Sequence, residues 1–298
     1  MIVYILQKNA GFFSEIFFMI NYYLMSQRYS WHFVISTKNW LFKYKNGWHD
    51  YFNSLEEYDN ITKAYLAPQK IPEEINLNFP NINFTLNDYM NVMKRLFVLN
   101  DTLQTIYKNT VINLNLNNYH SIFIRRGDKI IEESLFISTS KYIDKLLEKD
   151  KSIKTIFIQT DDYNVYLEAI DYVNLLKLDI KVLTTCPESK CGVHMFNINT
   201  SGSTLSKEND TYIKNQNKNT KPIIQLNNEE IYEHTIEMLV GLEICKHSKY
   251  LALDLQSNVS RYLLLTHDNY TNVIDIQNNI LDFNKPVLCP TIGIKYKD

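Results

Sequence analysis

Short apolar runs that each end in polar residues dominate the second half of this chain. The runs SIFI (121–124), TIFIQ (155–159) and YLAL (250–253) have the length and β-branched content of buried strands. A further run, IKVLT (180–184), lies between them, and segments with helical spacing separate the runs. Strands that alternate with helices along a chain predict a parallel sheet covered by helices.

The first half opens with the same alternation. A strand is expected at 2–6, followed by a helix with one apolar face and a second strand at 31–35. One long helix is expected over 88–108. The sequence therefore predicts an α/β protein with two Rossmann-like domains facing a crevice, residues 1–112 and 113–298.

Three polar clusters follow three of the predicted strands. They are RRGDK (125–129), TDD (160–162) and DLQSNVSR (254–261). In parallel α/β sheets, ligands bind outside the carboxyl ends of the strands. We therefore expect the three clusters to lie at one edge of the sheet and to form a ligand site.

These side chains suit a ligand that carries phosphate. Arginine is always charged and offers a fork of donors, so Arg125 and Arg126 fit a pyrophosphate. Ser257 and the amides that open the following helix add donors. Glu133 is a candidate general base, and Lys129 could polarise a leaving phosphate. Together these residues make a nucleotide-sugar transferase plausible. The phosphate loops of ATPases and dehydrogenases, G-x-x-x-x-G-K and G-x-G-x-x-G, are absent from the chain.

Other features exclude or leave open several classes. A net charge of −2 gives no electrostatic case for nucleic-acid binding. No Asp-x-Asp occurs, so the usual metal site of sugar transferases is not expected. Neither a secretory signal nor a membrane-spanning segment is apparent, which predicts a cytoplasmic protein. Cys186 and Cys191 could form a disulfide, although buried thiols are the simpler interpretation.

Each candidate residue also has a purely structural interpretation. Two adjacent arginines are often a solvated surface pair, and aspartates before a helix, such as Asp161 and Asp162, often cap it. Tyr142, at helical spacing, would then be a core residue, and Glu133 a surface carboxylate. The tripeptide Arg-Gly-Asp at 126–128 could mediate adhesion, which would require an exposed loop.

At these same residues the sequence resembles the α1,6-fucosyltransferases, which include the core N-glycan and chitin-oligosaccharide enzymes. The family motif H-x-R-R-x-D-K appears as FIRRGDK (123–129), and the family's catalytic glutamate and functional tyrosine fall on Glu133 and Tyr142. TDD recurs at 160–162, and T-F-S-S-x-V-x-R is similar to DLQSNVSR (254–261). The N-W…G-W pattern of the family's first half is also present, so the resemblance spans roughly residues 9–265.

The resemblance implies a GT-B-like, inverting and metal-independent transfer of fucose from GDP-fucose to a hydroxyl of an oligosaccharide or glycan acceptor. Under it, Glu133 removes the acceptor proton, Lys129 steadies it, Arg125 holds the β-phosphate, and Asp161 helps to orient the acceptor. The residues expected around the donor are Arg125, Arg126, Asp128, Tyr142, Asp162, Ser257 and Tyr44. No cofactor other than this donor substrate is implied.

Two positions depart from the family pattern, both at residues that contact guanine in the family. The histidine two residues before the first arginine is Phe123, and an aspartate of a later helix is Gly241, with Glu237 and Glu243 nearby. The alternatives that stay open are an α1,2- or protein-O-fucosyltransferase and a non-catalytic nucleotide- or glycan-binding relative.

Overall fold

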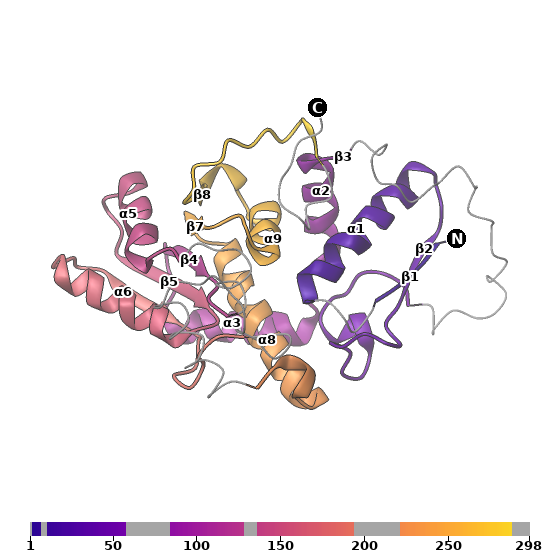
Figure 1. Cartoon of the computed structure of the whole chain (residues 1–298), viewed down its shortest axis with the longest axis horizontal. Coiled ribbons are helices and arrows are strands. Elements are labelled where there is room, and N and C mark those ends of the chain that lie inside the picture. Colours follow the sequence, from indigo (N-terminus) through magenta and orange to yellow (C-terminus); the bar gives the residue numbers. More distant parts are fainter. Residues whose placement is uncertain (1, 7–10, 58–83, 128–135, 194–220, 288–298) are drawn as a thin grey trace, which may run out of the picture. The chain divides into compact units, whose positions relative to one another are not determined.

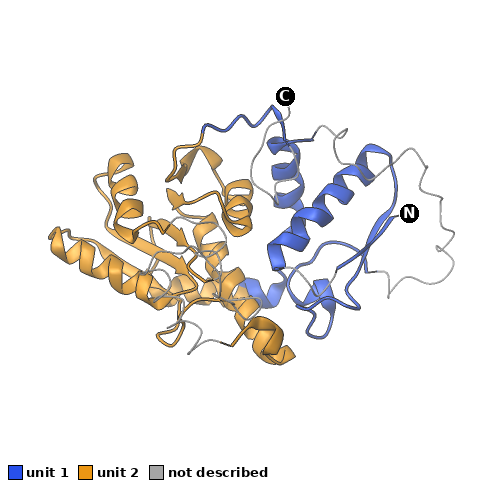
Figure 2. Ribbon diagram, in the orientation of Figure 1, with its two compact units in different colours: residues 1–104, 280–298 blue, residues 105–279 orange. Residues whose placement is uncertain are grey.

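The computed structural model describes residues 2–6, 11–57, 84–127, 136–193 and 221–287. The chain divides into two compact units, residues 1–104 with 280–298 (unit 1) and residues 105–279 (unit 2), shown in Figure 2. The predicted boundary at 112/113 and the observed one at 104/105 fall within the same helix, α3 (Asp101–Leu114). The division also differs from the predicted one at the C-terminus. Residues 280–298 belong to unit 1, where β9 (Pro286–Val287) pairs antiparallel with β3 (Phe84–Thr85).

Unit 1 begins with the predicted strand, helix and strand. β1 (Ile2–Ile5) and β2 (Phe33–Ser36) pair in parallel, and α1 (Phe12–Arg28) connects them (Figure 1). A loop and a short 3₁₀ helix, η1 (Gly47–Asp50), follow. The core of this unit is largely aromatic. Its buried rings include Phe12, Trp40, Phe42, Trp48, Tyr51, Phe52 and Phe97.

The single helix expected over 88–108 is wrong, because the chain forms two helices there. α2 (Leu86–Leu96) ends before the buried Phe97, and α3 begins at Asp101. The Asn100 side chain accepts a hydrogen bond from the Leu103 amide at 3.0 Å and donates to the backbone carbonyls of His49 and Asp50. Long-range contacts with η1 therefore place a helix start where helical spacing alone continues.

Unit 2 contains the predicted parallel sheet. Its strands are β4 (His120–Ile124), β5 (Thr155–Thr160), β6 (Lys181–Thr184), β7 (Leu251–Leu253) and β8 (Val273–Asp275). Their order is β6-β5-β4-β7-β8, and every neighbouring pair is parallel. The sequence interpretation did not include β8, a three-residue edge strand. Besides the later part of α3, the helices and short 3₁₀ turns in the described part of this unit are α5 (Thr139–Lys149), α6 (Tyr163–Leu175), η5 (Ile223–Gln225), α8 (Asn228–Lys246), α9 (Asn258–Thr266) and η6 (Tyr270–Asn272).

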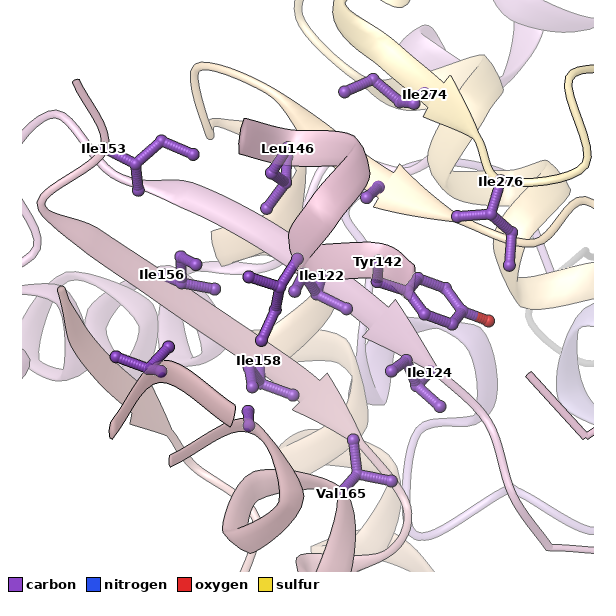
Figure 3. Packing of buried hydrophobic residues seen from close by; sticks show 14 residues of the cluster. Ile122, Ile124, Tyr142, Leu146, Ile153, Ile156, Ile158, Val165, Ile274 and Ile276 are labelled. Atoms are coloured by element: carbon purple, nitrogen blue, oxygen red, sulfur yellow. The ribbon is translucent and has the colours of Figure 1, made fainter. Parts of the chain in front are cut away.

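The two faces of this sheet are covered by different helices. Ile122 and Ile124 point into an aliphatic cluster with side chains of α5 and α6 (Figure 3). Since side chains alternate along a strand, Phe123 and its register partner Gln159 point to the opposite face. Gly241 of α8 lies directly against Gln159 there. The carboxyl ends of β5, β4 and β7 thus lie side by side, between two layers of helices.

Candidate functional site

The sheet order brings the three predicted polar clusters to one edge. Residues 125–127 follow β4, Asp161 and Asp162 follow β5, and residues 254–257 follow β7. We call residues 125–127 the arginine turn. Because β4 lies between β5 and β7, this turn is flanked by the other two clusters. The site described below belongs entirely to unit 2.

Arg125 leaves the end of β4 toward this edge. Its side chain is 23% exposed, and its Nε lies 4.0 Å from Oδ2 of Asp161. By strand alternation Arg125 belongs with Phe123, on the side of the sheet covered by α8. A partly exposed guanidinium at this edge can donate hydrogen bonds to an anionic ligand.

Arg126 points the opposite way and is 3% exposed. Its guanidinium donates to the carbonyl of Ile137 at 2.9 Å and to Glu168 at 3.3 Å, and it lies 4.0 Å from the centre of the Phe136 ring. These partners tie β4 to the region of α5 and α6, so direct donor binding by Arg126 stays a prediction. Burial of Arg126 and Gly127 also contradicts the adhesion alternative, which requires an exposed loop.

Asp161 connects the arginine turn to a neighbouring segment. Its Oδ1 accepts the amide of Arg126 at 2.7 Å, and its Oδ2 accepts the amide of Val193 at 3.3 Å. A Cβ added to Gly127 would collide with the Val193 carbonyl oxygen and lie 2.9 Å from Asp161 Oδ2. The arginine turn and the backbone at Val193 therefore touch at residue 127, where only glycine fits.

Asp162 and Tyr142 occupy structural positions. Asp162 is buried and caps α6, accepting both the amide and the side-chain N–H of Asn164 at 3.0 Å, and its burial raises its pKa. Tyr142 lies in the aliphatic cluster near Ile122 and Ile124 (Figure 3), where burial raises the pKa of its phenol. Their predicted contacts with a donor stay predictions.

The turn after β7 leads into the start of α9. Ser257 caps this helix and accepts the amide of Ser260 at 3.0 Å. The buried Arg261 donates to the carbonyls of Leu255 and Gln256 at 3.0 and 2.9 Å, which holds the turn in shape. The first amides of α9 therefore open at the same edge as Arg125, and helix starts favour anions.

Sequence reasoning missed Gln159 and Lys190. Gln159 is buried on β5 beside Phe123, and among the described residues its Oε1 has no hydrogen-bond partner. It fills the space that a side chain at position 241 would need. Lys190 donates to Glu237 of α8 at 2.6 Å. A polar residue ending an apolar run was the available signal for Gln159, whereas nothing in the sequence marks Lys190.

The two glutamates near Gly241 lie in different surroundings. Glu237 lies beside Lys190, whose backbone contacts the start of α6 at the carboxyl edge. Glu243 binds Lys246 and His247 near the end of α8. The adjacent Ile244 carbonyl accepts a hydrogen bond from Tyr119, just before β4 begins, so Glu243 lies toward the amino edge of the sheet. Of the two, only Glu237 is placed near the candidate site.

The remaining predicted residues lie elsewhere. Asp128, Lys129 and Glu133 are outside the described residues. Tyr44 belongs to unit 1, where its amide donates to Asp50 at 2.9 Å and the Lys45 ammonium lies over its ring. Its place near a ribose stays a prediction.

In the described ranges, no group of three or more His, Cys, Asp or Glu side chains is arranged to hold a metal ion. Cys186, Cys191 and Cys245 are free thiols, so the 186–191 disulfide is not formed. No described helix has both the length and the apolar character needed to cross a membrane.

No protein-family model and no curated protein matches this chain. Two solved fucosyltransferase structures align with most of it. The NodZ α-1,6-fucosyltransferase soaked with GDP-fucose is 10% identical, with 92% of this chain and 94% of that chain covered and a TM-score of 0.49. Fucosyltransferase NodZ from Bradyrhizobium is also 10% identical, with 93% and 95% covered and a TM-score of 0.45. Similarity this distant does not assign a function, so the function has to be inferred from the side chains at the sheet edge.

Proposed function

We propose that this chain is a fucosyltransferase that binds GDP-fucose at the carboxyl edge of the unit 2 sheet and transfers fucose to a glycan hydroxyl. The observation that carries the proposal is the meeting of Arg125, the start of α9 and the Asp161 turn at adjacent strand ends. This combination supplies a fixed cation and helix amides where α/β sheets bind ligands.

In the proposed reaction, the acceptor oxygen attacks the anomeric carbon of fucose as the bond from that carbon to the phosphate oxygen breaks. The configuration inverts, and GDP leaves with the bonding electrons. Arg125, assisted by Ser257 and the α9 amides, stabilises the negative charge that develops on the pyrophosphate. Glu133 takes the acceptor proton, with Lys129 nearby, as the family resemblance implies.

The finer assignments belong to the same proposal. We place the linkage in the α1,6 class, because the lysine of the family motif is present at Lys129. We propose a GT-B-like pair of domains in which unit 1 supplies the acceptor side and Tyr44. Cationic side chains rather than a divalent metal neutralise the leaving group, since Asp-x-Asp is missing from the sequence. An α1,2- or protein-O-transferase and a non-catalytic relative remain the competing functions.

Calorimetry with GDP, UDP and ADP tests the donor. We expect GDP to bind most tightly, with Glu237 the candidate to contact the base in place of a residue at Gly241. Equal affinity for the three nucleotides would contradict the donor assignment. Turnover of GDP-fucose with a panel of GlcNAc-terminated and other glycans, with and without EDTA, then tests the acceptor and the metal-free mechanism. GDP binding without turnover of any glycan would favour the non-catalytic relative.

A further inference from the structure

A short segment after β6 runs across the carboxyl ends of its neighbours. We call residues 190–193 the strap. The amide of Tyr163 donates to the carbonyl of Lys190 at 2.9 Å, and the amide of Gly192 donates to the carbonyl of Asp161 at 2.7 Å. The Lys190 ammonium fixes the other side of the strap to Glu237 of α8. The strap is thus attached to the turn after β5, to the start of α6 and to α8.

The Asp161 carboxylate joins this strap to the arginine turn. One oxygen accepts the Arg126 amide, and the other accepts the Val193 amide. The second oxygen also faces Nε of Arg125. A single side chain therefore holds both sides of the contact and lies beside the partly exposed guanidinium of Arg125.

Gly127 shows independently that the contact is tight. Any side chain there would meet the Val193 carbonyl oxygen and the Asp161 carboxylate. The strap cannot stay in place if residue 127 carries a Cβ, unless the backbone shifts. Two different residues, Asp161 and Gly127, thus depend on the same approach of turn and strap.

We propose that Asp161 is a positioning residue, which acts through Arg125 and does not bind the acceptor or transfer a proton. Its carboxylate locks the arginine turn against the strap, and this lock directs the Arg125 guanidinium to the anion. Each oxygen already accepts a backbone amide, and the side chain is 14% exposed, so it is better placed to hold the turn than to meet a substrate. The identity of the anion as GDP rests on the proposed function.

Three variants test this role: Asp161→Asn, Asp161→Ala and Gly127→Ala. Asparagine keeps an oxygen for the Arg126 amide, and its NH₂ group replaces the oxygen that accepts the Val193 amide and faces Nε of Arg125. We expect Asp161→Asn to keep GDP affinity and kcat within about fivefold of wild type, because it keeps the shorter bond, at 2.7 Å, which holds the amide of Arg126. Asp161→Ala and Gly127→Ala should each weaken GDP binding and raise KM for GDP-fucose by about tenfold or more. Asp179→Asn is the control, because it removes a carboxylate from an exposed ion pair with Lys154.

The distinguishing result is rescue by asparagine. If Asp161→Asn loses turnover as severely as Asp161→Ala while both bind GDP normally, Asp161 takes part in the chemistry and the proposal is wrong. Wild-type GDP affinity in both Asp161→Ala and Gly127→Ala would also overturn it.

Amide hydrogen exchange separates this proposal from the proposed function. Peptides that cover residues 121–127 and 190–193 should exchange faster in Asp161→Ala and Gly127→Ala, and near the wild-type rate in Asp161→Asn. This readout needs no nucleotide. Failure of the wild type to bind GDP would therefore refute the proposed function alone, whereas unchanged exchange in the alanine variants would refute the positioning role.

Discussion

Two aspartates hold turns by the same means in the two units, but the turns carry different groups. In unit 1, Asp50 accepts the amides of Tyr44, Lys45 and Asn46 at 2.8–3.0 Å. In unit 2, Asp161 accepts two amides and lies beside the partly exposed Arg125. The Asp50 turn belongs to a unit whose buried core is largely aromatic, whereas the Asp161 turn is at the edge of a sheet with an aliphatic core on one face.

Asp50 therefore holds a turn of the unit 1 core, whereas Asp161 holds a turn of the candidate site. Around η1, Glu57 is also buried, and it accepts the Trp48 amide and the Thr37 hydroxyl. Changes in this region should act on stability. Changes around Arg125 should act on ligand binding, because a charge held for a ligand contributes little to the fold. The predictions below test this division.

Arg125→Ala should have the largest effect. We expect transfer to become undetectable and GDP binding to weaken by at least about 2 kcal/mol, because a charged phosphate donor is lost. The melting temperature without ligand should hardly change. Thermal shift without and with GDP measures the melting temperature and the stabilisation by GDP. A variant that GDP stabilises as it does the wild type would show that this edge is no anion site.

Glu133→Gln should leave GDP binding intact and lower turnover by about 10²-fold or more, the usual scale for a general base. The amide is nearly isosteric and far less basic. Glu132→Gln is the matched control, since it makes the same change one residue earlier and should keep its activity. Turnover near wild type in Glu133→Gln would mean that another residue is the general base.

Gly47→Ala should destabilise unit 1 by about 2–4 kcal/mol. Gly47 has φ +63°, and a Cβ there would collide with the side chains of Thr37 and Glu57. All three tryptophans belong to unit 1, so tryptophan fluorescence during urea unfolding reports on this unit. A variant with an unchanged transition but lost GDP binding would break the proposed division of roles.

Arg126→Ala should destabilise unit 2 by about 2 kcal/mol, since it leaves the Ile137 carbonyl and Glu168 without this donor. The value stays moderate because Glu168 is 41% exposed. GDP affinity should fall far less than in Arg125→Ala. Arg126→Met keeps apolar contact with the Phe136 ring and separates packing from charge. Calorimetric unfolding measures the loss of stability, and GDP titration measures the loss of affinity. A loss of affinity equal to that of Arg125→Ala would contradict the structural role of Arg126.

The smallest effect concerns pH and the far end of α8. Hydrogen bonds to Glu243 and Asp268 raise the pKa of His247, which lies 32% exposed beside Lys246 and the Tyr107 ring. A raised folded-state pKa gives stability that is complete below the unfolded value of about 6.5 and is lost as pH rises through the folded value. The melting temperature should therefore fall slightly between about pH 6 and pH 9, and His247→Gln should flatten this slope. Equal slopes would exclude His247 as the cause.

The regular elements of unit 2 were predictable because their signals are local. The runs at 121–124, 155–159 and 180–184 became strands β4, β5 and β6, and the alternation with helices correctly predicted a parallel sheet. In unit 1, the strand-helix-strand opening was also correct. The helix break before Asp101 was not predictable, because it depends on contacts between Asn100 and the carbonyls of His49 and Asp50.

The sequence by itself determined most of the strands and helices and the polar clusters that follow the strands, since periodicity and turn chemistry act over a few residues. Alternation along β4 also implied that Arg125 and Arg126 diverge. Only the tertiary structure decided which partners each side chain meets. It placed Arg126 among α5 and α6, set Gln159 against Gly241, and brought the strap to Asp161. These contacts join residues more than ten positions apart, and their geometry depends on how the helices and loops pack around the sheet, which local patterns do not encode.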